Sequence, residues 1–444
     1  MKITFIRPNM NDEFSKDAMQ PLAFAVLKGL TPKYIETELF DDRIEKINFE
    51  TNSEVIAITA ETFTVKRAYE IATEFKKRGK KVIMGGYHPT FMPEESLEFC
   101  DSVVIGEAEP LWQKVIVDLE NNELKKIYKS SENFEVENVF FDESIFEGKK
   151  YASVIPVQFS RGCKFNCEFC SISSFYNKKI KFRCIKNVVE EIKRKNSKYF
   201  FITDDNIFTN KIKLKEFLKE LIPLKIKWGC QISIDISNDE GLLDLMAKSG
   251  CISILIGFES LNQINLKQMN KDTNIKNFDY NSKIKKIKER GIMIYGTFVF
   301  GYDGDTVESF EETLNFAIEN KFFLANFNPL IPMPGTQIYN RLNLEKRLIY
   351  DKWWLDDNFK YGETVFLPKG MTPKQLEEGC FDLRTRFNSY SSIFKRIWDF
   401  RSNAKNIHNF FVYFGANLIS RREIFNKQGK KLGGENIENN SNKT

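Results

Sequence analysis

Three cysteines stand within one short stretch of the chain, RGCKFNCEFC at residues 161–170: Cys163, Cys167 and Cys170. Thiolates bind zinc and iron–sulfur clusters, so these residues at this spacing predict a metal centre. Polar residues fill the gaps between them, which argues against one buried helical face despite the i, i+4, i+7 spacing. Closed zinc sites take four ligands, whereas three thiolates on an iron–sulfur cube leave one iron open. A zinc site and three buried structural cysteines are the other interpretations.

The composition sets limits on partners and surroundings. The chain has 444 residues, enough for two domains and an extension. Its net charge is only +5, so nothing calls for DNA, and RNA is a minority interpretation. Eight cysteines in so long a chain do not form a disulfide framework and favour a reducing compartment. No apolar run approaches the ~20 residues of a spanning helix, and the first residues do not form a signal peptide. We therefore expect a cytoplasmic protein.

Short β-branched runs alternate with helical patterns along most of the chain, which predicts an α/β protein with parallel sheets. The first part is typical of a flavodoxin-like, doubly wound sheet. Six later runs in series predict a partial (β/α)6 barrel of the TIM type. A mainly helical C-terminal extension follows. We expect the divisions 1–130 for the first sheet, 131–150 for a linker, 151–335 for the partial barrel, 336–430 for the extension and 431–444 for a disordered tail.

Both predicted sheets should bind ligands at the carboxyl ends of their strands. Glycines after a strand let a flat ligand pass close to the backbone. The alternative is a domain without a ligand, in which a histidine beside a proline turn is structural. The candidate residues at the first sheet's carboxyl edge are Thr62, Gly85, Gly86, His88, Gly106 and Glu107.

The motif CxxxCxxC formed by Cys163, Cys167 and Cys170, with Phe169 before the third cysteine, resembles the signature of the radical S-adenosylmethionine (SAM) superfamily. The resemblance extends over residues ~150–340. It implies that the three cysteines bind a 4Fe-4S cluster whose open iron chelates the amino and carboxylate groups of SAM. An electron from the reduced cluster then cleaves SAM to a 5′-deoxyadenosyl radical.

Other predicted strand ends fall where this superfamily places its contacts to SAM. Asp204 or Asp205, in TDDN, is implied as the acceptor for the methionine amino group, and a helix N-cap is the alternative for either. Ser233 and Glu259 are implied as hydrogen-bonding partners of ribose or carboxylate, with a salt bridge inside the barrel as the alternative for Glu259. The glycines implied to let the backbone approach the ligand are Gly257 and Gly296.

The stretches VIMGGYHPTFMPEE and VVIGEAEPLW resemble the cobalamin-binding domain that precedes the barrel in one class of these enzymes, the class of hopanoid methylase and magnesium-protoporphyrin oxidative cyclase. The resemblance implies cobalamin as a third cofactor at the first sheet's edge. Residues 41–50 depart from it, because they contain neither histidine nor glycine and so lack the DxHxxG loop that supplies a cobalt ligand. His88 is the remaining histidine that could face the corrin.

These features together predict a cobalamin-dependent radical SAM methyltransferase acting on an unactivated carbon of a small or lipid-like metabolite. A flavodoxin or ferredoxin-type electron donor is the implied partner. The alternatives are a radical cyclase or oxidoreductase, with cobalamin as a mediator or absent, and a non-catalytic iron–sulfur carrier or sensor. The aromatic and basic residues 392–425 suit peripheral contact with a membrane or contact with an apolar substrate, and packing on the barrel is the other interpretation.

Overall fold

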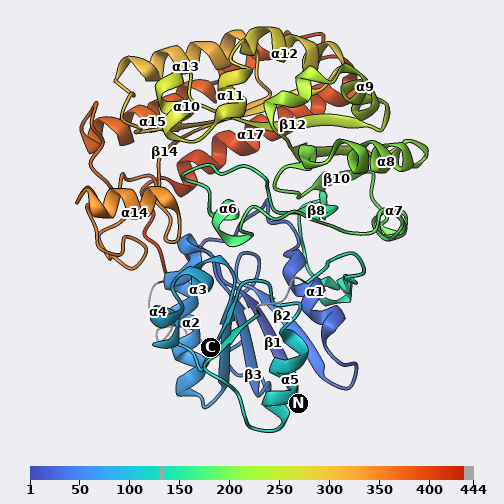
Figure 1. Ribbon diagram of the computed structural model, residues 1–444, viewed down its shortest axis with the longest axis vertical. Helices are drawn as coiled ribbons and strands as arrows, with labels where there is room; N and C mark the ends of the chain where they lie inside the picture. Colours follow the sequence, from blue (N-terminus) through green and yellow to red (C-terminus); the bar gives the residue numbers. More distant parts are fainter. Residues whose placement is uncertain (131–133, 435–444) are drawn as a thin grey trace.

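The structure is a computed structural model that describes residues 1–130 and 134–434. Two parallel sheets, each with its own helices, account for most of these residues. The N-terminal sheet lies below the C-terminal one in Figure 1. Helix α6 (Ser171–Phe175), which follows the cysteines directly, lies on the side of the upper unit that faces the N-terminal sheet.

The N-terminal sheet is parallel throughout, in the order β2-β1-β3-β4-β5-β6. This order is the flavodoxin-like one with an added edge strand, so the predicted doubly wound fold is confirmed. Val and Ile dominate the central strands because both faces of the sheet are covered. The strands are β1 (Lys2–Arg7), β2 (Glu36–Asp41), β3 (Val55–Thr59), β4 (Lys81–Gly85), β5 (Ser102–Ile105) and β6 (Ile127–Lys129).

Helices cover both faces of this sheet. Helix α2 shows why they form: Ala68, Ile71, Ala72 and Phe75 recur at helical spacing and are buried. Lysines in its last turn stabilise the helix by interacting with the negative end of its dipole. The helices are α1 (Leu22–Leu30), α2 (Val65–Lys77), α3 (Tyr87–Phe91), α4 (Pro93–Leu97) and α5 (Trp112–Glu120).

Residues 134–150 are packed rather than extended between two units. Val136, Val139 and Phe141 are buried in the core between the N-terminal sheet and α1, and so is Phe146. The interval that we predict as a linker is therefore, over its described part, a layer of the N-terminal unit. Its acidic residues conceal this role in the sequence because its apolar residues follow no helical or strand period.

The second sheet is an open, six-stranded partial barrel, called the half-barrel below, in the order β14-β13-β12-β11-β10-β7. All of its neighbours are parallel, so the predicted (β/α)6 barrel is confirmed over the described residues. A small antiparallel pair, β8 (Ser160–Arg161) with β9 (Lys181–Phe182), extends the end of β7. The six strands are β7 (Ile155–Val157), β10 (Tyr199–Ile202), β11 (Lys227–Gln231), β12 (Cys251–Glu259), β13 (Met293–Phe300) and β14 (Leu324–Pro329).

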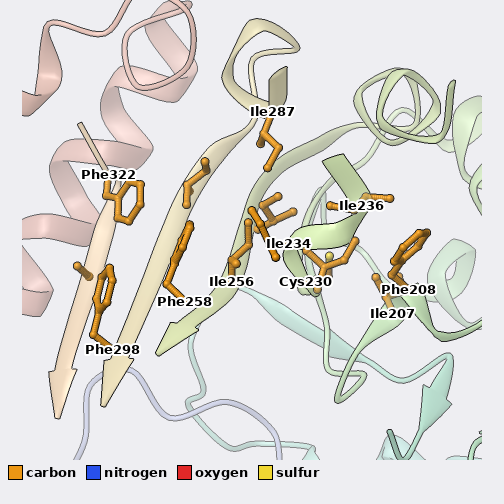
Figure 2. Close-up of a cluster of buried hydrophobic side chains, with 14 of the residues drawn as sticks. Ile207, Phe208, Cys230, Ile234, Ile236, Ile256, Phe258, Ile287, Phe298 and Phe322 are labelled. Carbon is orange, nitrogen blue, oxygen red and sulfur yellow. The ribbon is translucent and has the colours of Figure 1, made fainter. Parts of the chain in front are cut away.

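Helices pack on the outer face of this half-barrel, and Figure 2 shows the apolar core between them and the strands. Aromatic rings from neighbouring strands stack there, such as Phe258 on Phe298 at 5.7 Å. The helices after α6 are α7 (Ile185–Arg194), α8 (Lys211–Leu221), α9 (Glu240–Lys248), α10 (Gln263–Gln268), α11 (Asp272–Lys276), α12 (Tyr280–Glu289), α13 (Glu308–Glu319) and α14 (Gln337–Leu344).

The last part of the chain joins the two units. Trp353 and Trp354 are buried against the N-terminal sheet, while α15 (Pro373–Phe387), α16 (Tyr390–Ile397) and α17 (Ile407–Lys427) pack on the half-barrel. Helix α15 begins with a capping box and a proline at its first position. Of the predicted disordered tail, residues 435–444 lie outside the described residues. No helix in residues 1–130 or 134–434 is long and apolar enough to cross a bilayer.

Candidate active site

The cysteines lie on a loop that leaves β8 through one obligatory turn. Gly162 has φ +87°, and a side chain there would overlap the carbonyl of Lys179. The Gly162 amide donates to Asp205 Oδ2 at 2.7 Å, which fixes the start of the loop against the end of β10. The sequence RGC thus begins the cysteine loop at the carboxyl edge of the barrel, as predicted.

Two further contacts hold the middle of the loop. Glu168 pairs with Arg341 of α14 through two parallel hydrogen bonds of 2.7 and 3.1 Å. The Glu168 amide donates to the Met269 carbonyl at 3.0 Å. Such fork-to-fork pairing restricts orientation as well as distance. The loop is therefore preorganised by protein contacts before any cofactor binds.

The three cysteines are free thiols enclosed by the protein. Cys167 is buried, and Cys163 and Cys170 are partly buried. Burial raises the pKa of all three, to about 11 for Cys167, and the nearby Lys271 charge acts in the opposite direction. A cation beside enclosed thiols stabilises the thiolate form that binds metal.

The donor set fits an iron–sulfur cube better than a single ion. Within residues 1–130 and 134–434, no three His, Cys, Asp or Glu side chains converge closely enough to hold one metal ion. Each thiolate on a four-iron cube binds a different iron, so the thiols must surround the cube rather than meet at one point. A tetrahedral zinc ion needs the tighter arrangement. The loop is therefore compatible with a cluster and gives zinc no closed site.

Lys271 is the residue beside the cysteines that sequence reasoning missed. Its Nζ lies 2.8 Å from Glu259 Oε1 and 5.8 Å from the ring centre of Phe169. Although burial acts against the charge, Glu259 and Cys167 raise the pKa of Lys271, so it is a cation. A side chain at Gly257 would overlap the Glu259 carboxylate. The glycine therefore makes room for this ion pair over the end of β12.

Glu259 has an unusual backbone that turns its carboxylate toward the cysteines. Its φ is +64°, and the register between β12 and β13 shifts between Gly257 and Glu259. A positive φ is uncommon for any residue other than glycine. Backbone strain of this kind is concentrated at functional sites. The predicted salt bridge inside the barrel is present, and its partner Lys271 faces the cysteine loop.

The neighbouring aspartates after β10 have different roles. Asp204 is fully buried, and its two oxygens accept from the Phe159 and Ser160 amides at 2.8 and 2.7 Å. Burial raises the pKa of Asp204 to about 7. Asp205 instead faces Cys163 and accepts a hydrogen bond from the Gly162 amide. Of the two predicted candidates, Asp204 is a structural clamp and Asp205 faces the site.

Two more residues predicted to contact SAM, Ser233 and Gly296, lie on different sides of the barrel strands. Ser233, after β11, accepts a hydrogen bond from Asn206 at 3.2 Å and is partly exposed at the carboxyl edge. Gly296 faces the other way: a side chain there would overlap the ring of Phe322, which Figure 2 shows beside Phe298 in the core. The prediction that Gly296 approaches a cofactor is therefore wrong. Its missing side chain makes room for a core ring.

A cavity of about 420 Å³ lies between the carboxyl edge of the N-terminal sheet and residues that flank the cysteine loop, namely Gln158, Arg161, Phe175 and Tyr176. Gly106 has φ +82°, with open space where a side chain would point. Phe175 of α6 lines the barrel side, and its ring lies 4.6 Å from that of Tyr87 of α3. Four of the predicted residues line the cavity: Gly85, Gly86, Gly106 and Glu107.

The other two predicted residues of this edge do not line the cavity. His88 is buried, its Nε2 lies 3.0 Å from Glu95 and its Nδ1 lies 3.3 Å from the Thr62 hydroxyl. Trp354 donates to the same Glu95 at 3.1 Å. Both nitrogens of His88 are thus engaged inside the protein. The interpretations of His88 as a corrin contact and of Thr62 as a cofactor residue are corrected: both residues are structural.

Arg43 stands in the stretch where a DxHxxG loop would carry its histidine, and it lines the cavity. Its guanidinium makes two hydrogen bonds to Asp41, at 2.9 and 2.7 Å. A guanidinium has no lone pair for a metal. The sequence showed that histidine was missing, but only the structure shows which side chain takes its place.

Arg161 joins the two edges. It is buried at the end of β8 and forms ion pairs with Glu107, at 3.3 Å, and with Glu109, both from the loop after β5. Lys181 of β9 also pairs with Glu107. Glu107, predicted as a cofactor residue, therefore binds cations of the barrel as well as lining the cavity. Arg161 precedes the first cysteine by two positions, so its place beside the cysteine motif was the sequence signal for a role at this edge.

This pair of opposed sheet edges, one with three thiols and one with glycine turns around a cavity, is the arrangement expected of an enzyme with two cofactor-binding domains. Comparison with known families agrees. The radical SAM superfamily matches residues 157–317, and the B12 binding domain matches residues 21–115.

Two curated methyltransferases and one solved structure resemble the chain over most of its length. The bacteriochlorophyllide d C-8(2)-methyltransferase of Chlorobaculum tepidum is 34% identical, over 78% of this chain and 80% of its own. The C-12(1)-methyltransferase of that organism is 30% identical over 85% and 84%. The radical SAM methyltransferase TsrM from Kitasatospora setae, solved with cobalamin and a [4Fe-4S] cluster, shares the fold, with a TM-score of 0.63 and 15% identity over 85% and 81% of the chains.

The chain belongs to the cobalamin-binding class of the radical SAM superfamily. Its function is that of a cobalamin-dependent radical SAM methyltransferase, with a 4Fe-4S cluster, SAM and cobalamin as cofactors. The predictions of family, enzyme class and cofactors are confirmed. The roles of individual residues are proposals that their geometry supports.

Proposed function

We propose that Cys163, Cys167 and Cys170 hold the 4Fe-4S cluster and that the cavity beside them holds cobalamin. The observation that carries this assignment is the position of three free thiols at the barrel's carboxyl edge, opposite the glycine turns of the N-terminal sheet. When bound, the cluster and SAM supply one-electron bond cleavage, and cobalamin supplies a methyl group for transfer to carbon.

The residues around the cysteines provide complementary charges for the amino-acid end of SAM. Lys271 is the cation for its carboxylate, and Asp205 is the acceptor for its amino group. Glu259, 2.8 Å from Lys271 Nζ, keeps this lysine charged and directed toward the thiols. Ser233 and the backbone at Gly257 face the ribose, and Phe169 shields the cluster from water. Preorganised charges of this kind need little rearrangement when the ligand binds.

The cavity residues suit a large ring more than a small ion. Gly85, Gly86 and Gly106 leave backbone exposed to it, and Glu107 forms one wall. No histidine among the described residues lines this cavity. We therefore propose that cobalamin binds without an imidazole on cobalt, with Arg43 as the nearest cation from the loop after β2.

We propose that the substrate is a flat, apolar ring system with an acidic side group, and that the enzyme methylates an unactivated carbon on it. Two similar proteins methylate bacteriochlorophyllide d. We place the substrate beside the corrin, against the rings of Tyr87, Phe175 and Tyr176 at the side of the cavity formed by α3 and the end of α6.

The test is a product analysis. The protein is reconstituted anaerobically with iron, sulfide and cobalamin, then reduced and given SAM and bacteriochlorophyllide d. We expect 5′-deoxyadenosine, S-adenosylhomocysteine and a product heavier by one methyl group. A product that has lost hydrogen without gaining carbon would contradict methyl transfer and indicate ring closure, the reaction named for a relative at 25% identity.

We propose a flavodoxin or ferredoxin-type protein as the electron donor and the cytoplasm as the location, because eight reduced cysteines suit a reducing compartment. Reduction of the cluster by purified flavodoxin, followed by its absorbance, tests the donor. We also propose peripheral contact with a lipid surface through the C-terminal helices, because large apolar side chains are exposed on them.

A further inference from the structure

The inner side of helix α17 contacts the protein through polar as well as apolar side chains. Asn417 donates to the Phe323 carbonyl at 3.0 Å, and Asn409 donates to the Ser402 carbonyl at 2.9 Å. Tyr413, between them on the helix, is buried in a small apolar core. Both asparagines are buried. A helix on a water-exposed surface normally buries its apolar side and presents its polar side.

The opposite side of α17 presents apolar side chains to the outside. Ile407 is 70% exposed, Phe411 66%, Leu418 43% and Phe425 48%. Their spacing of 4, 7 and 7 residues places all four on one side of the helix. Isolated exposed apolar residues need no explanation, but an aligned row of them indicates a surface that something apolar covers.

The row continues onto the neighbouring segment as one apolar surface. The Phe394 ring of α16 lies 5.7 Å from that of Phe414, and Phe414 lies 5.5 Å from Phe410. Trp398 and Phe400, 62% and 67% exposed, lie 5.9 Å apart in the turn after α16. We call this surface the apolar face: its members are Phe394, Trp398, Phe400, Ile407, Phe411 and Leu418.

Positive charge borders the apolar face. A hollow of about 470 Å³ next to Trp398 and Phe400 is lined by four cations, Lys285, Lys288, Lys321 and Arg401, against two carboxylates, Asp399 and Glu319. Asp399 is occupied by Lys288 at 2.6 Å. Burial, together with the nearby charges of Lys321 and Arg401, lowers the pKa of Lys288. The local field is therefore positive.

The sequence keeps this region basic. Residues 389–422 contain five arginines and lysines besides the buried Arg396, namely Lys395, Arg401, Lys405, Arg421 and Arg422, and one acidic residue, Asp399. Two copies of such a face would bring like charges together, which disfavours self-association through it. Exposed tryptophan and phenylalanine bordered by lysine and arginine are typical of surfaces that lie in the headgroup region of a bilayer.

We propose that the apolar face docks on an anionic lipid surface, with its aromatic side chains among the acyl chains and the basic hollow at the phosphate headgroups. The inference rests on the proposed peripheral contact and not on the methyl-transfer chemistry. The face lies on the half-barrel beside the amino ends of β13 and β14, whereas the cofactor cavity is at the carboxyl ends, so docking leaves the cavity uncovered.

Vesicle sedimentation with the full-length protein tests the proposal. Phosphatidylcholine vesicles with and without phosphatidylglycerol are the two probes. We expect binding to the mixed vesicles and much weaker binding to the neutral ones. The double variant Phe411→Ser/Leu418→Ser should lose at least about tenfold in affinity, since each side chain contributes more than a kilocalorie when buried. Arg401→Gln should lose about fivefold on the anionic vesicles only.

Ile212→Ser is the matched control, because Ile212 is 72% exposed on α8, away from the apolar face, and should bind like the parent protein. All substituted side chains are exposed, and circular dichroism verifies the fold. Equal binding of parent and double variant overturns the proposal, and so does the absence of binding. A parent dimer that Phe411→Ser/Leu418→Ser converts to monomer, seen by ultracentrifugation, overturns it in favour of a second copy. None of these readouts requires active enzyme.

Discussion

The two carboxyl edges that face each other use opposite means to prepare for a ligand. The barrel edge is built from paired charges: Lys271 with Glu259, and Glu168 with Arg341. The N-terminal edge is built from missing side chains, and its histidine is withdrawn into the core with Glu95. A small charged ligand needs complementary charges at fixed points, whereas a large rigid ring needs open backbone.

Removing a thiol should produce the largest effect and should affect one edge only. Cys167→Ala removes one proposed cluster ligand, so cluster absorbance and 5′-deoxyadenosine formation should fall to background. Cobalamin binding, followed by its visible absorbance, should persist. Cys184→Ala is the control, because Cys184 is a partly buried free cysteine outside the motif. A full cluster in Cys167→Ala would show that another residue supplies the ligand.

Removing the cation beside the thiols should have the next largest effect. Lys271→Met leaves the Glu259 carboxylate buried and unpaired, which costs about 3–5 kcal/mol in folding free energy, and should weaken SAM binding by roughly 100-fold. Adding Glu259→Gln should restore the melting temperature without restoring SAM affinity. Lys267→Met, at an exposed position of α10, is the control. Recovery of SAM binding in the double variant would mean that Lys271 acts only through Glu259.

Filling the open edge should have a smaller, selective effect. Gly106→Ala projects a methyl group into the cavity and should weaken cobalamin binding by about tenfold, with cluster content unchanged. The methyl group also meets a φ of +82°, which costs about 1 kcal/mol. Gly148→Ala has the same kind of strain, at φ +75° with open space, but lies outside the cavity. Equal cobalamin affinity in the two variants would place the corrin elsewhere.

The withdrawn pair His88–Glu95 predicts a dependence of stability on pH. Burial lowers the pKa of His88, and although burial opposes it, hydrogen bonds from His88 and Lys352 lower the pKa of Glu95 to about 2. In the unfolded chain His88 is protonated below about pH 6.5 and Glu95 below about pH 4.3, whereas in the folded chain both bind protons only at lower pH. Stability should fall as pH falls through these values.

Urea unfolding at several pH values measures this effect. The parent midpoint should decline steadily between about pH 7 and pH 3. Glu95→Gln should be less stable near neutrality and should show a flatter decline below about pH 4.5. Glu94→Gln is the control, since Glu94 is the preceding residue of α4 and is not buried. An unchanged slope in Glu95→Gln would exclude this carboxylate as the titrating group.

The sequence contains most of the fold and the centre of the site, because both depend on local patterns. Each of the six predicted barrel strands is present, and the cysteine spacing and glycine turns are contiguous motifs. The roles of Asp204 and Asp205 could not be predicted, since both lie in the loop after β10, and only tertiary structure shows which carboxylate faces the thiols. Lys271 follows Glu259 by twelve residues with no fixed spacing rule to connect them.

The position of Gly296 on the helix-covered side of its strand could have been predicted from the sequence. Phe298 lies two residues later, hence on the same side of the strand, and its size and apolarity predict the helix-covered face. The linker prediction failed for a different reason. Residues 131–150 contain six acidic residues and seven apolar ones, and the apolar ones, which matter for packing, are irregularly spaced.

Arg161 has a consequence for how the molecule comes apart. Its buried guanidinium belongs to the cysteine loop but is neutralised by Glu107 and Glu109 of the other unit. Lys181 also pairs with Glu107, so separating the units would leave four charges without partners, and partial opening is disfavoured relative to complete denaturation. In scanning calorimetry the two units should share a single endotherm, and loss of corrin colour should coincide with loss of cluster colour.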